Sequence, residues 1–272
     1  MDFLGHLLRV TPDFRGKRRF LHFWMQHRHS GDERKCILAC GARIFCDMSH
    51  PYERMIWLRK EESADLAALR RLLRPGETFV DCGANIGLWT LTAATAVGTT
   101  GRVFAFEPNP STYEKLLRNV RANRFETIVR PFCSACGETS GHLPFRCESD
   151  HNVSRVAEEG ADGTESVPVV TLQEAVGNRP VHGIKVDVEG FELKVLRGAE
   201  EILRRSKPWL CVEFNPHLTG IKRLGDWDVN RFLTGLGYVC TEMTGFPGKT
   251  EARVLAADWE TNGYCNLFYF QP

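Results

Sequence analysis

Phe79-Val-Asp-Cys-Gly-Ala-Asn-Ile-Gly87 has the pattern of an apolar strand that ends in an acid and a glycine-rich turn. A second apolar run, Val103-Phe-Ala-Phe-Glu-Pro-Asn109, comes after a helical stretch and ends in Glu107. Open α/β sheets place their ligand crevice at such strand ends, where small residues let the backbone approach the ligand and a second-strand carboxylate faces ribose hydroxyls. The two runs therefore predict an α/β fold with a nucleoside site.

The turn has the spacing DxGxNxG, formed by Asp81, Gly83, Asn85 and Gly87. It lacks the GxGxxG that brings a helix N-terminus against a pyrophosphate. A nucleoside without phosphates fits this turn better than a dinucleotide, and S-adenosylmethionine is the obvious candidate. The two glycines alone would be weak evidence, because many α/β proteins use glycine merely for tight turns. Glu107 at the end of the next strand strengthens the prediction of a site.

The composition describes a chain without a strong global charge. It has 272 residues, 43% of them apolar, and a net charge of +1, so it can bury one sizeable core and shows no overall sign of a nucleic-acid partner. No apolar run reaches the roughly 18 residues of a membrane span, and the first residues lack the parts of a secretory signal. We therefore expect a cytoplasmic protein. The near-neutral charge and the aromatic N-terminus permit a homodimer without requiring one.

Ten cysteines are many for a cytosolic chain of this length. Cys133 and Cys136 form a CxxC, and three more cysteines cluster upstream within residues 36–46. Structural zinc usually needs paired CxxC motifs or histidines at fixed spacing, and there is no second CxxC. We therefore expect reduced thiols and no metal. Several of the cysteines lie in apolar strands, where a thiol behaves as a small hydrophobe: Cys82, Cys211, Cys240 and Cys265.

The chain divides into two predicted parts. Residues 1–62 form an N-terminal cap, with a basic aromatic segment over 1–35 and two short strands within 36–48. We favour packing or a substrate-side cap over membrane binding for the basic segment, because its polar face mixes acids and histidines with the cations. Residues 63–272 form the second part, in which helices and strands alternate, and this implies a mainly parallel sheet with helices on both faces. The predicted strands are 79–82, 103–106, 128–133, 141–146, 166–170, 184–187, 209–213, 238–243 and 264–270, and the predicted helices are 63–73, 86–96, 110–122, 190–204 and 226–236.

Three further strand ends carry polar groups. Ser134 and Ala135 form part of a turn, 134–137, after the third strand, where a hydroxyl and backbone groups are placed to meet an adenine. Asp187 and Glu189 follow the fourth strand, and Glu213 ends the fifth. In a doubly wound sheet all these ends converge on one crevice.

Asp187 and Glu189 are the candidates for catalysis. Glu189 lies near the start of a predicted helix, where a negative charge is favoured by roughly 0.3–1 kcal/mol, and Asp187 could be a helix N-cap. Neither of those roles involves chemistry. We favour a catalytic or substrate-contact role, because acids that end a sheet strand lie at the ligand crevice. Lys185 is expected to point to the other side of the strand, since side chains alternate.

These motifs resemble the FkbM-type methyltransferases, a branch of the Rossmann-like S-adenosylmethionine-dependent enzymes. The resemblance covers about residues 50–215, and Lys185-Val-Asp-Val-Glu-Gly-Phe-Glu192 is its most specific part. It implies a class I fold with a seven-stranded, mainly parallel sheet. It also implies O-methylation of a hydroxyl on a sugar, a polyketide or another secondary metabolite. The other matching runs are the two quoted at the start, Asn119 with Asn123, Val167-Pro-Val-Val-Thr-Leu172 and Val195-Leu-Arg-Gly-Ala199.

By matched position, the resemblance also implies the cofactor-binding residues. Four of them surround the methionine part of the cofactor: Asp81, Gly83, Asn85 and Gly87. Glu107 holds the ribose with Asn109 beside it, and the adenine lies against Ser134 and Ala135. Glu62 closes over the cofactor from the N-terminal side. One departure is Gln173, which stands where the family often has an aspartate near the loop 147–165.

Methyl transfer from a sulfonium is an in-line displacement with donor and acceptor about 3–3.5 Å apart. An alcohol acceptor also needs a base or a Lewis-acidic metal. Our hypothesis is that Asp187, with Glu189 as the second choice, accepts the hydroxyl proton or orients the acceptor. A less favoured scheme places Mg²⁺ on Asp187, Glu213 and Asn215, a layout similar to catechol-type O-methyltransferases. Against it, Glu213 and Asn215 could equally cap the turn before Pro216.

Other functions stay open. The chain could methylate nitrogen on an amino sugar or a peptide, although the Asn/Asp-Pro-Pro-Tyr/Phe signature of amide and nucleobase N-methylation is absent. It could also be a nucleoside-binding partner subunit without chemistry, against which Asp187 and Glu189 argue. A small-molecule acceptor is favoured over nucleic acid by the charge, while the basic N-terminal arm keeps nucleic acid open. His151 and His217 are spare candidates for a base.

Overall fold

A computed structural model of the chain describes residues 32–58, 64–146, 155–156, 163–221, 223–241 and 265–272. Most of the basic segment 1–35, Glu62, His151 and most of the loop 147–165 lie outside the described residues, as does the side chain of His217. Within the described part, no helix is long and apolar enough to cross a membrane.

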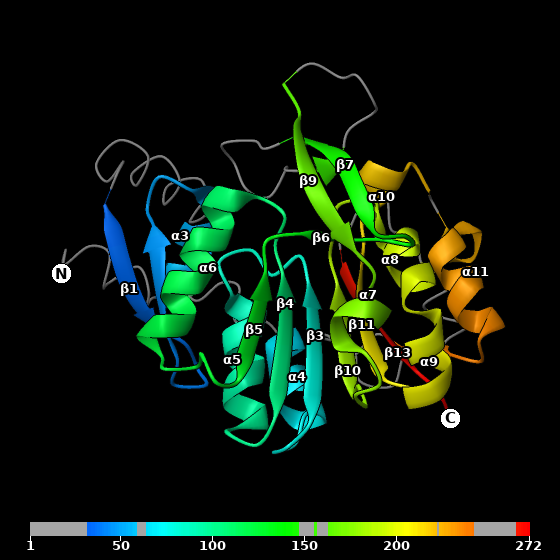
Figure 1. The fold of residues 1–272 in the computed structure, drawn as a ribbon, viewed down its shortest axis with the longest axis horizontal. Coiled ribbons are helices and arrows are strands. Elements are labelled where there is room, and N and C mark those ends of the chain that lie inside the picture. The colour runs from blue at the N-terminus through cyan, green and yellow to red at the C-terminus, as the bar shows by residue number, and fades with distance from the viewer. Residues whose placement is uncertain (1–31, 59–63, 147–154, 157–162, 222, 242–264) are drawn as a thin grey trace, which may run out of the picture.

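The largest sheet has seven strands, as predicted (Figure 1). All neighbouring strands pair in parallel except β13, which is antiparallel to both of its neighbours. The interior strand β3 is buried at all five positions, as expected for a parallel strand covered on both faces. In their order across the sheet the strands are β12 (Val239–Thr241), β13 (Cys265–Phe270), β11 (Trp209–Phe214), β10 (Gly183–Val186), β3 (Thr78–Cys82), β4 (Arg102–Phe106) and β5 (Val129–Phe132).

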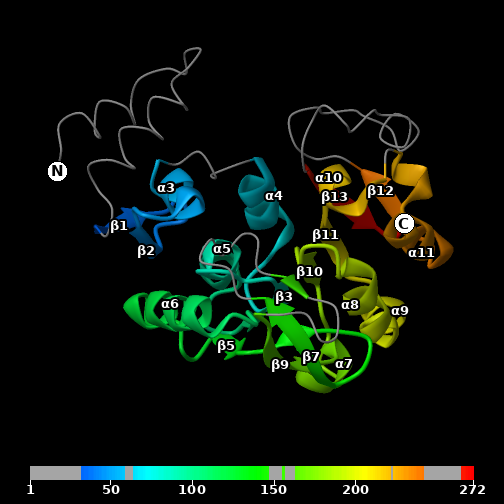
Figure 2. The same cartoon turned by 90° about the horizontal axis from the view of Figure 1, so that it is seen from above.

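Helices cover both faces of this sheet, and Figure 2 shows the two layers from above. Because strand side chains alternate, Phe79 enters the apolar cluster on one face and Val80 the cluster on the other. The first cluster packs against α3 (Pro51–Trp57), α4 (Ala64–Leu72), α5 (Leu88–Val97) and α6 (Pro110–Ala122). The second packs against α7 (Leu172–Val176), α8 (Glu192–Gly198), α9 (Glu200–Ser206) and α11 (Asp228–Gly235). Two short elements, α10 (Pro216–Thr219) and the 3₁₀ helix η2 (Leu224–Asp226), precede α11.

The helix predicted over 190–204 is two helices, α8 and α9, which meet at Ala199. A Cβ atom on Gly198 would lie only 2.0 Å from the carbonyl oxygen of Gly137. Glycine at this position therefore lets the backbone after β6 approach the end of α8. It also weakens the helix by about 1 kcal/mol relative to alanine, which favours a break there.

A second, four-stranded sheet follows β5 in the chain and contains strands that the sequence analysis predicted without assigning them to a sheet. Its order is β6 (Ala135–Cys136), β9 (Glu165–Val170), β7 (Gly141–Arg146) and β8 (Arg155–Val156). The expected turn at 134–137 thus includes the short strand β6, which pairs in parallel with β9.

The N-terminal strands β1 (Glu33–Ile37) and β2 (Arg43–Asp47) are short and antiparallel. Two short strands were predicted within 36–48, and β1 begins earlier, inside the basic segment 1–35. On its outer side, β2 meets α6 instead of another strand. Asn123 accepts from the backbone N–H of Arg43 (2.7 Å) and donates to its carbonyl (2.6 Å), while Asn119 accepts from the N–H of Phe45 (2.9 Å). The two amides, four residues apart on one helix face, therefore satisfy an otherwise open strand edge.

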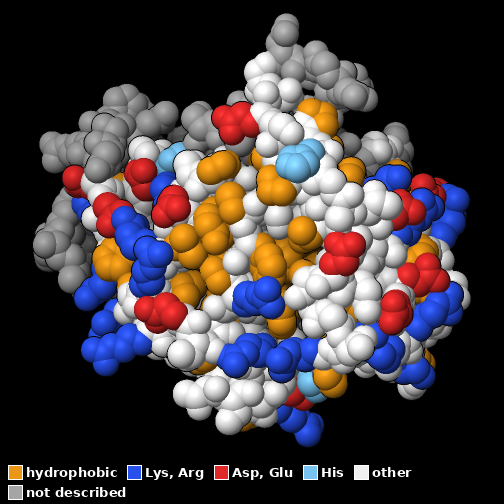
Figure 3. Space-filling model, viewed as in Figure 1, with side chains coloured by type: hydrophobic (Ala, Val, Ile, Leu, Met, Phe, Trp, Pro, Cys, Tyr) orange, Lys and Arg blue, Asp and Glu red, His pale blue; other side chains and the backbone are white. Residues whose placement is uncertain are grey.

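On the face shown in Figure 3, hydrophobic side chains gather in the middle, over β4 and β5. Three aromatic side chains of β4 and β5 stack on one another. The ring centroids of Phe106 and Phe132 are 4.6 Å apart, and those of Phe104 and Phe132 are 6.4 Å apart. Phe132 is half-buried and Arg130 lies over its ring. The β5 end of the sheet is thus held together largely by aromatic packing.

Candidate active site

The candidate site lies at the carboxyl ends of β4, β3, β10 and β11, which are consecutive neighbours in the sheet. The register pairs Asp81 with Lys185, and one residue further along the backbone N–H of Asp187 donates to the carbonyl of Cys82 (3.1 Å). The predicted convergence of strand ends is therefore present for these strands. Each polar side chain that follows is placed by its position on this edge.

Two glycines of the turn 83–87 have left-handed backbones that a side chain would strain. Gly83 has φ +81°, and a Cβ atom there would lie 1.8 Å from the carbonyl oxygen of Asp187. The missing side chain at Gly83 makes room for the protein's own backbone after β10. Gly87, with φ +100°, begins α5 as its N-cap residue. Asn85 also has a left-handed backbone, with φ 49°.

Glu107 is buried and held in place by two backbone groups. Its Oε1 accepts from the N–H of Asn109 and its Oε2 from the N–H of Asn85, both at 2.9 Å. Burial raises the pKa of Glu107 to about 7, against the lowering effect of these two hydrogen bonds. A carboxylate fixed in this way keeps lone pairs for ribose hydroxyls. The side-chain oxygen of Asn109 caps α6 by accepting from Ser111 N (3.0 Å).

Two buried polar atoms at this edge have no hydrogen-bond partner within the described part of the chain: Asp81 Oδ1 and Ser134 Oγ. The other carboxylate oxygen of Asp81 accepts from Thr90 Oγ1 at 2.5 Å. Buried polar atoms normally have partners, so each of these two atoms points to a ligand group. They belong to residues expected at the methionine and adenine parts of the cofactor, so the donor set fits S-adenosylmethionine. Ala135 is buried beside Ser134 at the start of β6.

The prediction for Lys185 was wrong. Its side chain lies on the same face as Asp187, because alternation places residues two positions apart on one side of a strand. The ammonium lies 2.9 Å from Asp187 Oδ2, 3.3 Å from the carbonyl of Gly83 and 3.9 Å from Asp81 Oδ1. Although burial alone would lower it, the pKa of Lys185 is raised by the carboxylates of Asp187 and Asp81. A buried cation therefore sits between two of the predicted site acids.

Asp187, Glu189 and Glu213 form an acidic cluster, in which one carboxylate oxygen from each lies within 4.8 Å of the others. Burial, together with the nearby carboxylates of Asp187 and Glu189, raises the pKa of Glu213 to about 10. Asn215, expected beside Glu213 in the magnesium scheme, instead caps α10 by accepting from Leu218 N (3.2 Å). The geometry thus brings Asp187 and Glu213 together, with Glu189 in place of Asn215.

Neither catalytic candidate stands at the N-cap or in the first turn of the helix that follows. The N-cap of α8 is Phe191, and the acid of its first turn is Glu192, whose Oε1 accepts from Gly190 N at 2.9 Å. Neither Asp187 nor Glu189 is therefore needed to begin the helix. Glu189 has a left-handed backbone, with φ 52°, which is uncommon for a residue with a side chain.

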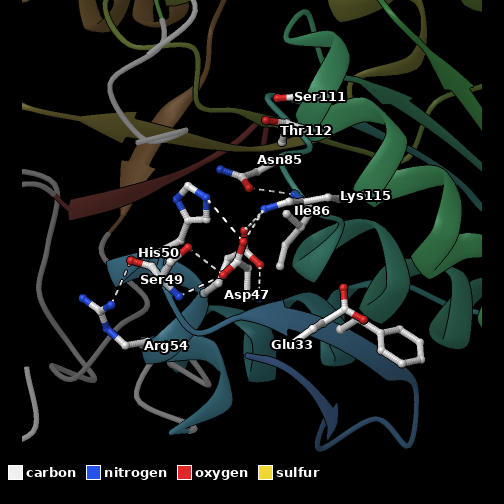
Figure 4. Close-up of polar contacts among 12 residues, drawn as sticks. Glu33, Asp47, Ser49, His50, Arg54, Asn85, Ile86, Ser111, Thr112 and Lys115 are labelled. Carbon is white, nitrogen blue, oxygen red and sulfur yellow. Dashed lines mark hydrogen bonds and ion pairs between the residues drawn. The ribbon is translucent and has the colours of Figure 1, made fainter. Parts of the chain in front are cut away.

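The polar residues through which the N-terminal part meets the turn were not predicted from the sequence. Figure 4 shows Asp47, His50 and Lys115 turned toward one another next to Asn85. Lys115 on α6 pairs with the buried Glu53 at 2.7 Å and lies 3.7 Å from Asp47. Lys115 shares one face of α6 with Asn119 and Asn123, at spacings of four residues, and this periodicity was the signal available in the sequence.

In the described part of the chain, the seven-stranded sheet has the strand order of a Rossmann-like class I methyltransferase fold, with β13 as its one antiparallel strand and acids at the carboxyl ends of β3, β4 and β10. A family model described as the methyltransferase FkbM domain matches residues 81–240. The chain therefore belongs to the FkbM methyltransferase family. Membership implies S-adenosylmethionine as the methyl donor.

Several relatives were found by sequence. The hexuronic acid methyltransferase AglP of Haloferax volcanii is 31% identical over 160 residues, covering 55% of this chain and 62% of that protein. Methyltransferase 1 of Beauveria bassiana is 28% identical over 151 residues, covering 47% of this chain and 60% of that protein. The matched regions thus span about three fifths of these relatives. Among solved structures, an FkbM methyltransferase from Methylobacillus flagellatus KT is 18% identical with a TM-score of 0.42, covering 94% of this chain and 59% of that chain.

Proposed function

We propose that this protein transfers a methyl group from S-adenosylmethionine to a hydroxyl of a small molecule, with a sugar as the first acceptor class to test. The observation that carries the proposal is the pair of unsatisfied buried atoms, Asp81 Oδ1 and Ser134 Oγ, on the edge where Glu107 is already held by two N–H groups. The hexuronic acid methyltransferase among the relatives supports a sugar hydroxyl as the acceptor.

Each residue has a defined part in this scheme. Bound S-adenosylmethionine supplies an electrophilic methyl group on a sulfonium. Glu107 accepts hydrogen bonds from the ribose, Asp81 Oδ1 accepts from the α-ammonium of the methionine part, and Ser134 Oγ meets the adenine. The acceptor lies on the side of Asp187, whose side chain is 31% exposed while its Oδ2 is fixed by Lys185. The carboxylate of Asp187 takes the hydroxyl proton as the acceptor oxygen bonds to the methyl carbon and the bond from that carbon to sulfur breaks.

The first experiment measures transfer of a tritiated methyl group to neutral sugars, uronic acids, amino sugars, polyketides and RNA. RNA is included because one relative, 26% identical, carries the name of a putative ribosomal RNA methyltransferase. Methylation of a sugar hydroxyl is the expected result. Label in the nitrogen of an amino sugar would favour N-methylation instead. Failure of the pure protein to bind S-adenosylhomocysteine in calorimetry would refute the proposal.

The base role is tested by Asp187→Asn with Glu189→Gln as the matched variant. Loss of a positioned base is expected to lower kcat by about 10²-fold or more in Asp187→Asn, with an unchanged circular dichroism spectrum. Wild-type kcat in that variant would refute the role of Asp187. A larger loss in Glu189→Gln would transfer the role to Glu189.

A second scheme uses the acidic cluster to hold Mg²⁺. The observation in its favour is that its three carboxylates lie within 4.8 Å of one another, and hard oxygen ligands suit this ion. Bound there, the metal would supply a Lewis acid for the acceptor hydroxyl. Full activity in excess EDTA would dispose of this scheme. Loss of activity in EDTA that Mg²⁺ restores would favour it over the base scheme.

A further inference from the structure

Lys185 is the cation at the centre of the candidate site. It lies on β10, next to Asp81 of β3 in the register, and its side chain is only 5% exposed. The ring of Trp89 on α5 lies 5.6 Å from its ammonium, on the helix-covered side. Four other titratable groups of the described residues act on it or feel its charge: Tyr52 of α3, Glu107, Cys211 and Glu213.

The two acids beside Lys185 are not equivalent partners. Asp187 Oδ2 lies at hydrogen-bond distance, 2.9 Å, whereas Asp81 Oδ1 at 3.9 Å is too far for a hydrogen bond. The Oδ2 atom of Asp81 accepts a hydrogen bond from Thr90. Its Oδ1 atom is therefore the one that is available for a ligand cation. The ammonium could reach Asp81 through a small side-chain movement if its bond to Asp187 were lost.

We propose that Lys185 is a positioning residue, which hydrogen-bonds to Asp187 and lies near Asp81 without bonding to it. By bonding to Asp187 it orients that carboxylate toward the acceptor, and the same bond keeps the ammonium from occupying Asp81 Oδ1. The inference rests on the proposed function, because it assigns Asp81 to the α-ammonium of the cofactor and Asp187 to the acceptor. Asp187 thereby holds the ammonium of Lys185 away from Asp81, which is left to bind the cofactor.

This arrangement predicts an unusual pattern of cofactor affinity. In Asp187→Asn the lysine loses its charged partner and turns to Asp81, where it competes with the α-ammonium. Binding of S-adenosylhomocysteine should then weaken by about tenfold, the order expected for a competing buried charge pair. Adding Lys185→Met to that variant removes the competitor, so the double variant should bind within about threefold of the wild type. Lys185→Met alone should lower kcat while KM for the methyl donor changes less.

The experiment measures S-adenosylhomocysteine binding by calorimetry, and kcat and KM by methyl transfer, for the wild type, both single variants and the double variant. Lys194→Met is the matched control, since it removes a lysine that is 51% exposed and paired with Glu138 on the surface. It should leave all values unchanged. If Lys185 had only a structural role, the double variant would bind S-adenosylhomocysteine no more tightly than the weaker-binding single variant.

Three results would each overturn the inference. Asp187→Asn could bind S-adenosylhomocysteine as tightly as the wild type, or the double variant could bind it no more tightly than Asp187→Asn. The third result is a wild-type kcat in Lys185→Met. If Lys185→Met alone fails to fold, the comparison of Asp187→Asn with the double variant still decides, because the double variant leaves only Asp81, and not both acids, without the lysine. A wild type that does not bind S-adenosylhomocysteine would refute the proposed function itself. A wild type that binds, without the expected rescue, would refute only the role of Lys185.

Discussion

The amide of Asn119 joins the N-terminal strands to the turn 83–87, so its replacement tests whether the two are energetically coupled. It accepts from Phe45 N (2.9 Å) and donates to the carbonyl of Ile86 (2.8 Å), and its side chain is fully buried. Asn119→Ala leaves a donor and an acceptor without partners, and Ile86 is itself completely buried. At about 1–3 kcal/mol for each of the two unsatisfied groups, we expect a loss of about 2–6 kcal/mol in the free energy of unfolding.

Asn123→Ala is the matched control. It removes the same side chain one helical turn later, from hydrogen bonds to Arg43 that solvent can replace. We expect a loss of about 1 kcal/mol there. Urea denaturation followed by circular dichroism measures both values. Of these two asparagines only Asn119 bonds to the turn. Asn119→Ala should therefore also weaken S-adenosylhomocysteine binding, by about threefold to tenfold, and Asn123→Ala should not. Equal losses of stability in the two variants, or equal affinities, would refute this reasoning.

Two more predictions concern the turn and the ribose acid. Gly83→Ala should cost about 3–5 kcal/mol, because its Cβ would lie 1.8 Å from the carbonyl of Asp187 in a left-handed backbone, whereas Gly220→Ala, with φ +69° and open space, should cost only about 1–2 kcal/mol. Equal urea midpoints for the two variants would contradict the first value. The pKa of Glu107 is about 7 and ribose binding requires its ionised form, so S-adenosylhomocysteine affinity should fall by up to about tenfold per pH unit below that value. Calorimetry between pH 5.5 and 8 measures this pH dependence, with Glu107→Gln as the variant that cannot titrate at this position. The same change of affinity with pH in both proteins would contradict the role of Glu107.

Local patterns were enough to predict most of the elements. The apolar run before Asp81 and the glycine turn after it fix a strand, a bend and a helix within a few residues of one another, so no distant contact is needed to recognise them. Pro110 after Asn109 likewise signals a helix start, and α6 begins there with Asn109 as its N-cap. The break at Gly198 was missed, because it depends on the backbone of Gly137 on another element.

The candidate site was only partly predictable for the same reason. That acids at strand ends gather at one edge follows from the parallel topology, and topology follows from the alternation of helices and strands. Which acids meet is a matter of register and side-chain direction. Asn215 looked like a partner for Glu213, yet its own backbone turn offers it a cap at Leu218, and Glu189 fills the place instead.

The sequence by itself determined the class of fold, the nucleoside-type turn and the set of acids at the crevice, because each of these is written in residues that are near neighbours in the chain. Only the tertiary structure decided that Gly83 makes room for the backbone of Asp187, that Lys185 lies between Asp81 and Asp187, and that Asn119 holds the N-terminal strands. These contacts join segments that are far apart in sequence. Their geometry is set by how the strands pair and pack, and local sequence patterns do not predict it.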